Sequence, residues 1–311
     1  MKESVYLEKR KFESLKGEIK DNVDICKKIL HLYEKEHIWS ESLIHIVSVI
    51  DNVKPGASFC DYNHNFDEVY EIQNSKVYNT LIECKIPFRV DVYGEIKSEK
   101  QPHEIEYKNR IPTYKIARNY NWIKKLPPFH HITKNNSMAD IENKYKNSWG
   151  DFLGVPDKDC AWMKEENVNT DITPMTTYGQ AYNQQVKFEN IEYSTLVPYV
   201  PYHSKDGLER AIDLGKKYYD ACVKFDNLMN VHYATEEASS RMVRLKESGK
   251  REIIKCELYE YYEKEHELFN KNSYKRDIFI ENMQDKYNFD KKLIKNIIQD
   301  IVLQEKIPNL N

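Results

Sequence analysis

Glycine is scarce in this sequence, with nine among 311 residues, and no glycine-rich phosphate-binding string occurs. The patterns Gly-x-Gly-x-x-Gly, the Walker loop and Gly-x-Ser-x-Gly are all missing, which argues against nucleotide binding through such a loop. Apolar runs long enough to cross a bilayer are missing too, so we expect no membrane association.

An excess of either charge is also lacking. Lys and Arg number 47 against 50 Asp and Glu, giving a net charge of −3, so no global field draws the chain toward nucleic acid. With 40% hydrophobic and 31% charged residues, the composition is that of a globular protein. Any binding of a polyanion would therefore depend on a local surface.

Closely spaced cysteines are absent. No Cys-x-x-Cys pair occurs, which excludes a zinc ribbon and a redox dithiol, and we expect free, mostly buried thiols with no metal and no cofactor. Two Glu-x-x-His pairs, Glu34 with His37 and Glu263 with His266, lie off the apolar faces of their predicted helices, where a metal site in a helical bundle could not use them. The six cysteines are Cys26, Cys60, Cys84, Cys160, Cys222 and Cys256.

The first twenty residues alternate charged and apolar side chains and contain no hydrophobic segment typical of a secretory signal. Their four acidic residues also argue against a mitochondrial presequence. We therefore expect an intracellular, cytoplasmic protein.

Hydrophobic periodicity predicts an α+β fold. Residues 24–50 have the spacing of one long helix or two stacked helices, and residues 57–62, 66–85 and 86–92 read as strand, helix and strand. A connection of that length suits two neighbouring parallel strands joined by a right-handed crossover, and one or two further strands are expected within 104–117.

The rest of the chain divides into a loop-rich middle and an all-α C-terminal third. Helices are expected from residue 206 to about 270, with a break at Ser248-Gly249, and a final amphipathic helix is expected to begin at the N-cap Asp290. We therefore predict a helical segment over 1–55, an α/β domain with the loop-rich middle over 56–205, and a helical region over 206–311.

One short motif imitates metal-dependent nucleases. Glu83-Cys84-Lys85, preceded by Asp67, has the order in which two carboxylates hold a divalent cation and a lysine activates the attacking water. That chemistry needs a strand at this point, whereas Leu81 and Ile82 are both apolar and indicate a helix. The alternative is the C-terminal end of a helix, where Lys85 is favourably placed.

The last two predicted helices have the lengths and the short turn of a helix-turn-helix. Lys291, Lys292 and Lys295 fall near the start of the second helix, where they could contact nucleic acid. Residues 240–311 carry little excess positive charge, so the alternative is a helical hairpin that packs on the body of the protein.

Four short blocks of sequence carry a family resemblance. Residues 54–57, 116–119, 151–163 and 196–203 occur in an order that resembles an uncharacterised, largely archaeal family, domain-of-unknown-function family 483, over roughly residues 50–225. Relatives often carry further cysteines in the last two blocks, but Val155, Tyr199 and Tyr202 stand at the counterpart positions here. The resemblance therefore implies no thiolate metal site, and it implies no activity.

Two interpretations of these blocks stay open. Gly154 and Pro156 form a tight turn that begins a helix at Asp157, which can be purely architectural. Alternatively, Arg118, Gly154, Pro156, Tyr199 and His203 line one ligand-binding cleft at the edge of the sheet. Our leading hypothesis is a ligand- or macromolecule-binding protein without established catalysis. The alternative is a metal-dependent nuclease or another nucleic-acid-binding protein.

Overall fold

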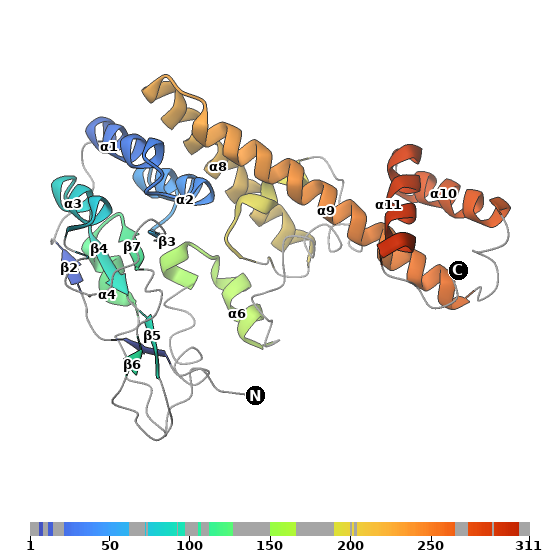
Figure 1. The fold of residues 1–311 in the computed structure, drawn as a ribbon, viewed down its shortest axis with the longest axis horizontal. Coiled ribbons are helices and arrows are strands. Elements are labelled where there is room, and N and C mark those ends of the chain that lie inside the picture. Colours follow the sequence, from blue (N-terminus) through green and yellow to red (C-terminus); the bar gives the residue numbers. More distant parts are fainter. Residues whose placement is uncertain are drawn as a thin grey trace.

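A computed structural model of the chain confirms the α+β fold, with helices and sheets in the first half and long helices in the second (Figure 1). The described residues are 6–8, 12–14, 22–61, 72, 74–91, 93–96, 105–106, 112–126, 150–165, 190–199, 201, 204–264, 273–287 and 289–304. In the first half, the helices are α1 (Asn22–Glu34), α2 (Ser40–Ile50), α3 (Lys76–Glu83), α4 (Tyr120–Lys125) and α6 (Asp157–Glu165).

The strands form two antiparallel sheets. One has the order β1-β5-β6 and the other has the order β2-β4-β7-β3. The strands are β1 (Tyr6–Glu8), β2 (Phe12–Ser14), β3 (Gly56–Cys60), β4 (Phe88–Asp91), β5 (Tyr93–Ile96), β6 (Ile105–Glu106) and β7 (Thr113–Ala117).

The strand-helix-strand unit is present as β3, α3 and β4, but its two strands are not neighbours. Strand β7 lies between them and pairs antiparallel with both, so Tyr114 stands opposite Phe59 on one side and Val90 on the other. The prediction of adjacent parallel strands was therefore wrong. Periodicity shows that a segment is a strand, but it does not show which later strand will insert between two earlier ones.

One face of the four-stranded sheet forms the main core with the first three helices. Alternate residues of β3, β4 and β7 are buried there, and the Phe59 and Tyr114 rings stack with centroids 5.6 Å apart. Helix α3 begins at the N-cap Ser75, whose hydroxyl accepts a hydrogen bond from the Tyr78 amide and also bonds the Tyr114 hydroxyl at 2.8 Å. This contact joins the helix cap to the sheet.

Helix α2 lies at the centre of the body. It is buried on nearly every side, packing on β3 beneath it and on the helices α8 and α9 of the second half. A short 3₁₀ helix, η2 (Ile191–Leu196), precedes α8 (Lys205–Met229) and packs against it. That packing is close, because a Cβ placed on Gly215 would lie 1.8 Å from the Tyr193 carbonyl oxygen.

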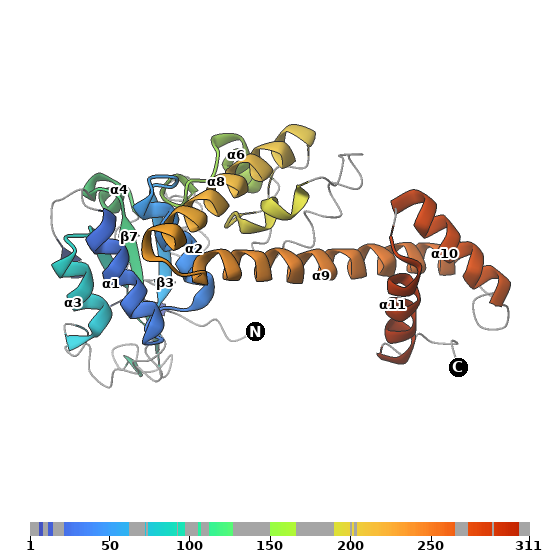
Figure 2. The same cartoon turned by 90° about the horizontal axis from the view of Figure 1, so that it is seen from above.

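Helix α9 (Tyr233–Lys264) projects from the body and carries the last two helices at its far end, as both views show (Figures 1 and 2). The predicted break at Ser248-Gly249 was wrong, because the helix continues through both residues. The chain turns earlier, at Asn230, which adopts a left-handed conformation that ends α8. A single glycine costs a helix about 1 kcal/mol, which is not enough to end one of this length.

The C-terminal module consists of the outer part of α9 with α10 (Ser273–Tyr287) and α11 (Lys291–Gln304). Asp290 caps α11 as predicted, accepting hydrogen bonds from the amides of Lys292 and Leu293. Ile298 is buried, whereas Lys291, Lys292 and Lys295 are exposed. The apolar face of α11 therefore packs inward on the neighbouring helices, and its lysines face outward.

Two further expectations can be compared with the described residues. No helix there has both the length and the apolar character needed to cross a bilayer. Cys60 and Cys84 are free and partly buried, and Cys26, Cys160 and Cys222 are free and buried, as expected. Burial raises the pKa of the Cys222 thiol to about 12, so this group is unreactive at neutral pH.

A first prediction separates the two faces of α11. Replacing Ile298 by Ala should lower the free energy of unfolding by about 2 to 5 kcal/mol, because it leaves a cavity among buried side chains. Replacing Lys291, Lys292 and Lys295 by Gln should change it by less than about 0.5 kcal/mol each. Urea denaturation checks both values. A nucleic-acid affinity that falls steeply in the triple Gln variant, at unchanged stability, would instead identify a recognition helix.

Candidate functional site

The turn around Gly154 packs directly on the segment that joins α2 to β3. Gly154 has a φ of +77°, and a Cβ placed on it would lie 3.0 Å from Cδ of Pro55. A Cβ on Gly56 would come within 2.3 Å of the Phe152 ring. The backbone amide of Arg118 donates a hydrogen bond to the Pro55 carbonyl at 2.9 Å. Three of the four sequence blocks therefore meet around Pro55.

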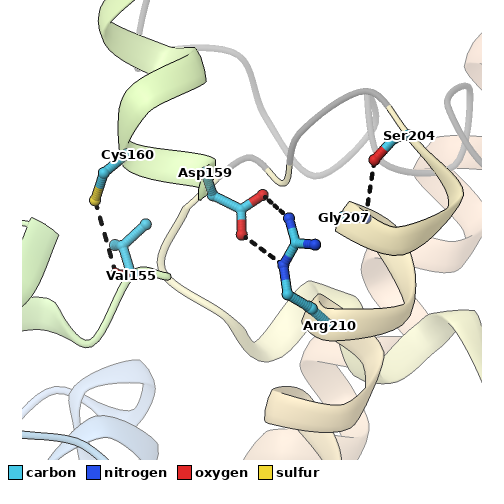
Figure 3. A network of polar contacts seen from close by, with 6 residues as sticks. All are labelled: Val155, Asp159, Cys160, Ser204, Gly207 and Arg210. Carbon is cyan, nitrogen blue, oxygen red and sulfur yellow. Dashed lines mark hydrogen bonds and ion pairs between the residues drawn. The ribbon is translucent and has the colours of Figure 1, made fainter. Parts of the chain in front are cut away.

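Helix α6 begins at Asp157, directly after Pro156, whose carbonyl accepts hydrogen bonds from the amides of Asp159 and Cys160. The Asp159 side chain is fully buried and forms a two-pronged ion pair with Arg210 of α8 (Figure 3). The two contacts measure 3.1 Å from Nη2 to Oδ1 and 3.4 Å from Nε to Oδ2. This pair joins the turn of the third block to the helix that follows the fourth.

Tyr199, from the fourth block, stands beside this ion pair. Its hydroxyl is buried, and no residue in the described part of the chain forms a hydrogen bond with it. Burial raises the pKa of Tyr199 well above its ordinary value, and the negative charge of Asp159 raises it further. The hydroxyl is therefore a neutral donor at physiological pH. His203, the remaining residue of the predicted cleft, lies outside the described residues.

A buried lysine lies on the other side of the same region. Lys54 is 2% exposed, and its ammonium nitrogen lies 5.5 Å from the centre of the Tyr218 ring. Among the described residues, no carboxylate lies close enough to raise the pKa of this lysine. The Tyr218 hydroxyl is buried and has no hydrogen-bond partner among the described residues. A charged group with so few compensating contacts is costly in a protein interior.

His45, from helix α2, lies against the same tyrosine. Its ring meets the Tyr218 ring edge-on, with centroids 6.1 Å apart. Its Nδ1 atom is buried and has no hydrogen-bond partner within the described segments. Burial lowers the pKa of His45 well below its ordinary value, and the positive charges of Lys54 and Arg241 lower it further. The imidazole is therefore neutral at physiological pH.

Arg241, from helix α9, lies near His45 and Lys54. Its Nε atom donates a hydrogen bond to the Thr195 carbonyl at 3.0 Å, and Nη1 lies 3.8 Å from a carboxylate oxygen of Glu41. Burial lowers the pKa of Arg241, although a guanidinium stays charged at any physiological pH. Glu41 also forms an ion pair with Arg244, so its carboxylate is shared by two guanidinium groups.

These residues form what we call the internal cluster, defined as His45, Lys54, Tyr199, Tyr218 and Arg241. They come from α2, the segment before β3, the segment before α8, α8 itself and α9. Both halves of the chain therefore contribute residues to the cluster, at the seam where α2 packs against α8 and α9. Burial and the nearby Arg241 charge lower the pKa of Lys54 to about 7. The arrangement offers donors and positive charge, which suits an anion and repels a metal cation.

The other predicted residues lie apart from this cluster. Glu83 is the last residue of α3 and pairs with Lys28 at 3.2 Å, whereas Lys85 follows the helix, exposed, with a φ of +55°. The motif therefore ends a helix, and the strand that nuclease chemistry needs begins only at Phe88. Asp67 lies outside the described residues. Lys291, Lys292 and Lys295 belong to the C-terminal module.

A metal site finds no support among the described side chains, because no group of three His, Cys, Asp or Glu residues gathers there. In comparisons with known proteins, the chain matches no family model, no curated protein and no solved structure. The resemblance to family 483 stays a prediction.

Sequence reasoning found Tyr199 and the blocks around it but missed most of the cluster. Lys54 opens the first block, and its position between a buried helix and a buried strand could have identified it as an interior lysine. His45 stands between the apolar pairs Leu43-Ile44 and Ile46-Val47, which is a weaker signal of the same kind. Tyr218 and Arg241 lie in long helices rich in charged residues, where nothing in the sequence distinguishes them.

A second prediction follows from the burial of Lys54. Replacing it by Met, which keeps the aliphatic length, should stabilise the ligand-free protein by at least about 1 kcal/mol at pH 6, because the variant buries no charge. The pKa of Lys54 is lower in the folded state than in the unfolded state, so the unfolded state binds more protons between pH 7 and 10.5. The gain should therefore be full below pH 7 and shrink as the pH rises.

Urea denaturation of both proteins at pH 6, 7.5 and 9 measures this difference, and the comparison cancels the titration of other groups. A Met variant that is less stable than the parent at pH 6 would show that the ammonium is well compensated.

Proposed function

We propose that this protein is a ligand-binding protein that holds a small anion in the internal cluster. The observation that carries the proposal is that the Lys54 ammonium and the His45 ring both lie against the Tyr218 ring, while the Tyr218 hydroxyl and His45 Nδ1 are buried and have no hydrogen-bond partner among the described residues. Buried polar groups are almost always hydrogen-bonded in native proteins, and several unpaired ones in one place indicate a missing partner.

The sign of the charge selects an anion over other partners. Water could satisfy the hydroxyls and the imidazole, but it would leave the Lys54 charge without a counterion in the interior. A second cation, Arg241, approaches from α9. An anion would satisfy the donors and balance the charge together, and hydrogen bonds to charged groups are roughly twice as strong as neutral ones.

A ligand at this position would also join the two halves of the body. Lys54 belongs to the segment that leads into the sheet, whereas Tyr218 and Arg241 belong to the long helices. The four sequence blocks lie around the same seam, where Gly154 packs on Pro55 and Tyr199 stands beside Asp159. Of the residues that the sequence assigned to a cleft, only Tyr199 belongs to the internal cluster, and the turn at Gly154 supports the segment that carries Lys54.

The test is calorimetric titration of the purified protein with chloride, acetate, sulfate and phosphate at pH 7, followed by thermal unfolding at saturating anion. At least one anion should bind and raise the melting temperature, because a ligand that binds only the folded state stabilises it. Lys54→Met should weaken binding by at least about tenfold, since it removes a charge-assisted hydrogen bond. Tyr218→Phe should weaken binding less.

The matched control is Lys217→Met, the same substitution at an exposed position on α8 next to Tyr218. It should leave the affinity unchanged. Equal weakening by Lys54→Met and Lys217→Met would mean that the anions act through general surface charge, and the proposal would then be wrong.

A further inference from the structure

We infer that the exposed face of helix α11 binds double-stranded DNA in the major groove, with α10 and α11 acting as a helix-turn-helix. This inference does not depend on anion binding in the internal cluster, because it concerns different residues at the far end of α9 (Figure 2). It is drawn from the geometry of the two helices, from the side chains that α11 exposes and from the balance of charge around them.

Helices α10 and α11 have the connection of a helix-turn-helix. Only residues 288–290 separate them, and α11 runs across α10 and α9 in both views (Figures 1 and 2). The turn is held in place, because the buried Phe289 ring stacks on the Tyr287 ring with centroids 5.3 Å apart, and Asp290 caps α11. Buried side chains of α9, α10 and α11 form one apolar cluster. The second helix is therefore fixed on a small three-helix unit.

The outer side of α11 carries lysine and amide side chains. Lys291, Lys295 and Gln299 follow one another four residues apart, and Lys292 and Asn296 form a second row beside them. All five are exposed, whereas the isoleucines on the opposite side of the helix are buried. We call these five residues the basic face. Its polar groups are free to meet a partner without any loss of apolar packing.

The positive charges of the basic face are not balanced within the described part of the protein. No described residue forms an ion pair with its three lysines. Asp300 is the one acidic residue within α11, and it pairs with Arg251 of α9 at 3.4 Å. Asp290, just before the helix, directs its carboxylate to backbone amides of the first turn. The face therefore offers three ammonium groups to a negatively charged partner.

The kinds of side chain on this face favour duplex DNA over other anionic partners. Lysines attract phosphates, and the amides of Asn296 and Gln299 are of the kind that pairs with adenine edges. A membrane surface calls for apolar anchors and a single strand calls for aromatic platforms, and the basic face contains neither. The major groove of B-DNA, about 12 Å wide, admits a helix, whereas that of duplex RNA is too narrow.

The test is fluorescence anisotropy of the full chain with a labelled DNA duplex of mixed sequence, measured between 50 and 200 mM NaCl. The parent protein should bind with a Kd in the micromolar range, and the affinity should fall steeply with salt. Replacing Lys291, Lys292 and Lys295 together by Gln should reduce the slope of log affinity against log salt by about 2.7, since each phosphate contact contributes about 0.9. At 100 mM NaCl, this variant should bind at least about a hundredfold more weakly.

The matched control carries the same three substitutions at exposed lysines of the body, Lys27, Lys35 and Lys217. It changes the net charge equally and should keep both the affinity and the salt slope of the parent. Thermal unfolding of both triple variants should match the parent, because all six lysines are exposed. The stability of the apolar face of α11 and the affinity of its basic face are then measured independently.

Two further measurements test the position of the helix in the groove. Asn296→Ala and Gln299→Ala should leave the salt slope unchanged but alter the sequence that the protein selects from a pool of random duplexes. Methyl green, which occupies the major groove, should displace the protein, whereas netropsin, which occupies the minor groove, should not.

The contrary outcomes are specific. Equal weakening by the two triple variants would show that DNA is held by general surface charge. Binding of duplex RNA or polyglutamate as tightly as DNA, displacement by netropsin alone, or no binding of DNA at 50 mM NaCl would each overturn the inference. None of these results bears on the internal cluster, whose proposed ligand is tested with small anions.

Discussion

The burial of helix α2 is the constraint on which the rest of the structure depends. Its apolar side chains, among them Leu43, Ile44 and Val49, cover more than half of its circumference, and such a helix is stable only when neighbouring elements cover most of its surface. The sheet covers it from one side and helices α8 and α9 cover it from others. The two halves of the chain therefore share one core, because neither half alone could cover this helix.

The internal cluster is the polar counterpart of that core. His45 is the basic side chain of α2, and Lys54 follows the helix by only a few residues, so both enter the seam where apolar surfaces meet. The large hydrophobic cluster around them offsets the free-energy cost of burying these two basic side chains. Its members come from many elements between Ile25 and Ala238. A charge buried in a well-packed core lowers the free energy of unfolding. Destabilising groups of this kind are found mainly at functional sites.

Local features were predictable from the sequence, and features that depend on distant partners were not. The alternation of Phe88 and Val90 identified a strand, Asp290 identified a helix start, and the paired apolar residues before Glu83 correctly indicated a helix. Each of these rests on a period or a cap within a few residues. The insertion of β7 between two earlier strands, and the meeting of Lys54 with Tyr218 across 164 positions, rest on tertiary packing that leaves no periodic trace.

Helix α9 connects the internal cluster to the C-terminal module without a break. Arg241 lies near its beginning, within the internal cluster, and Leu258 lies about 25 Å further along the same continuous helix, within the C-terminal module. A rigid rod converts a small rotation at one end into a displacement at the other, so a tilt of about 10° at the cluster would move the module by about 4 Å. A rotation of the helix at the internal cluster would therefore reach the C-terminal module along one continuous helix.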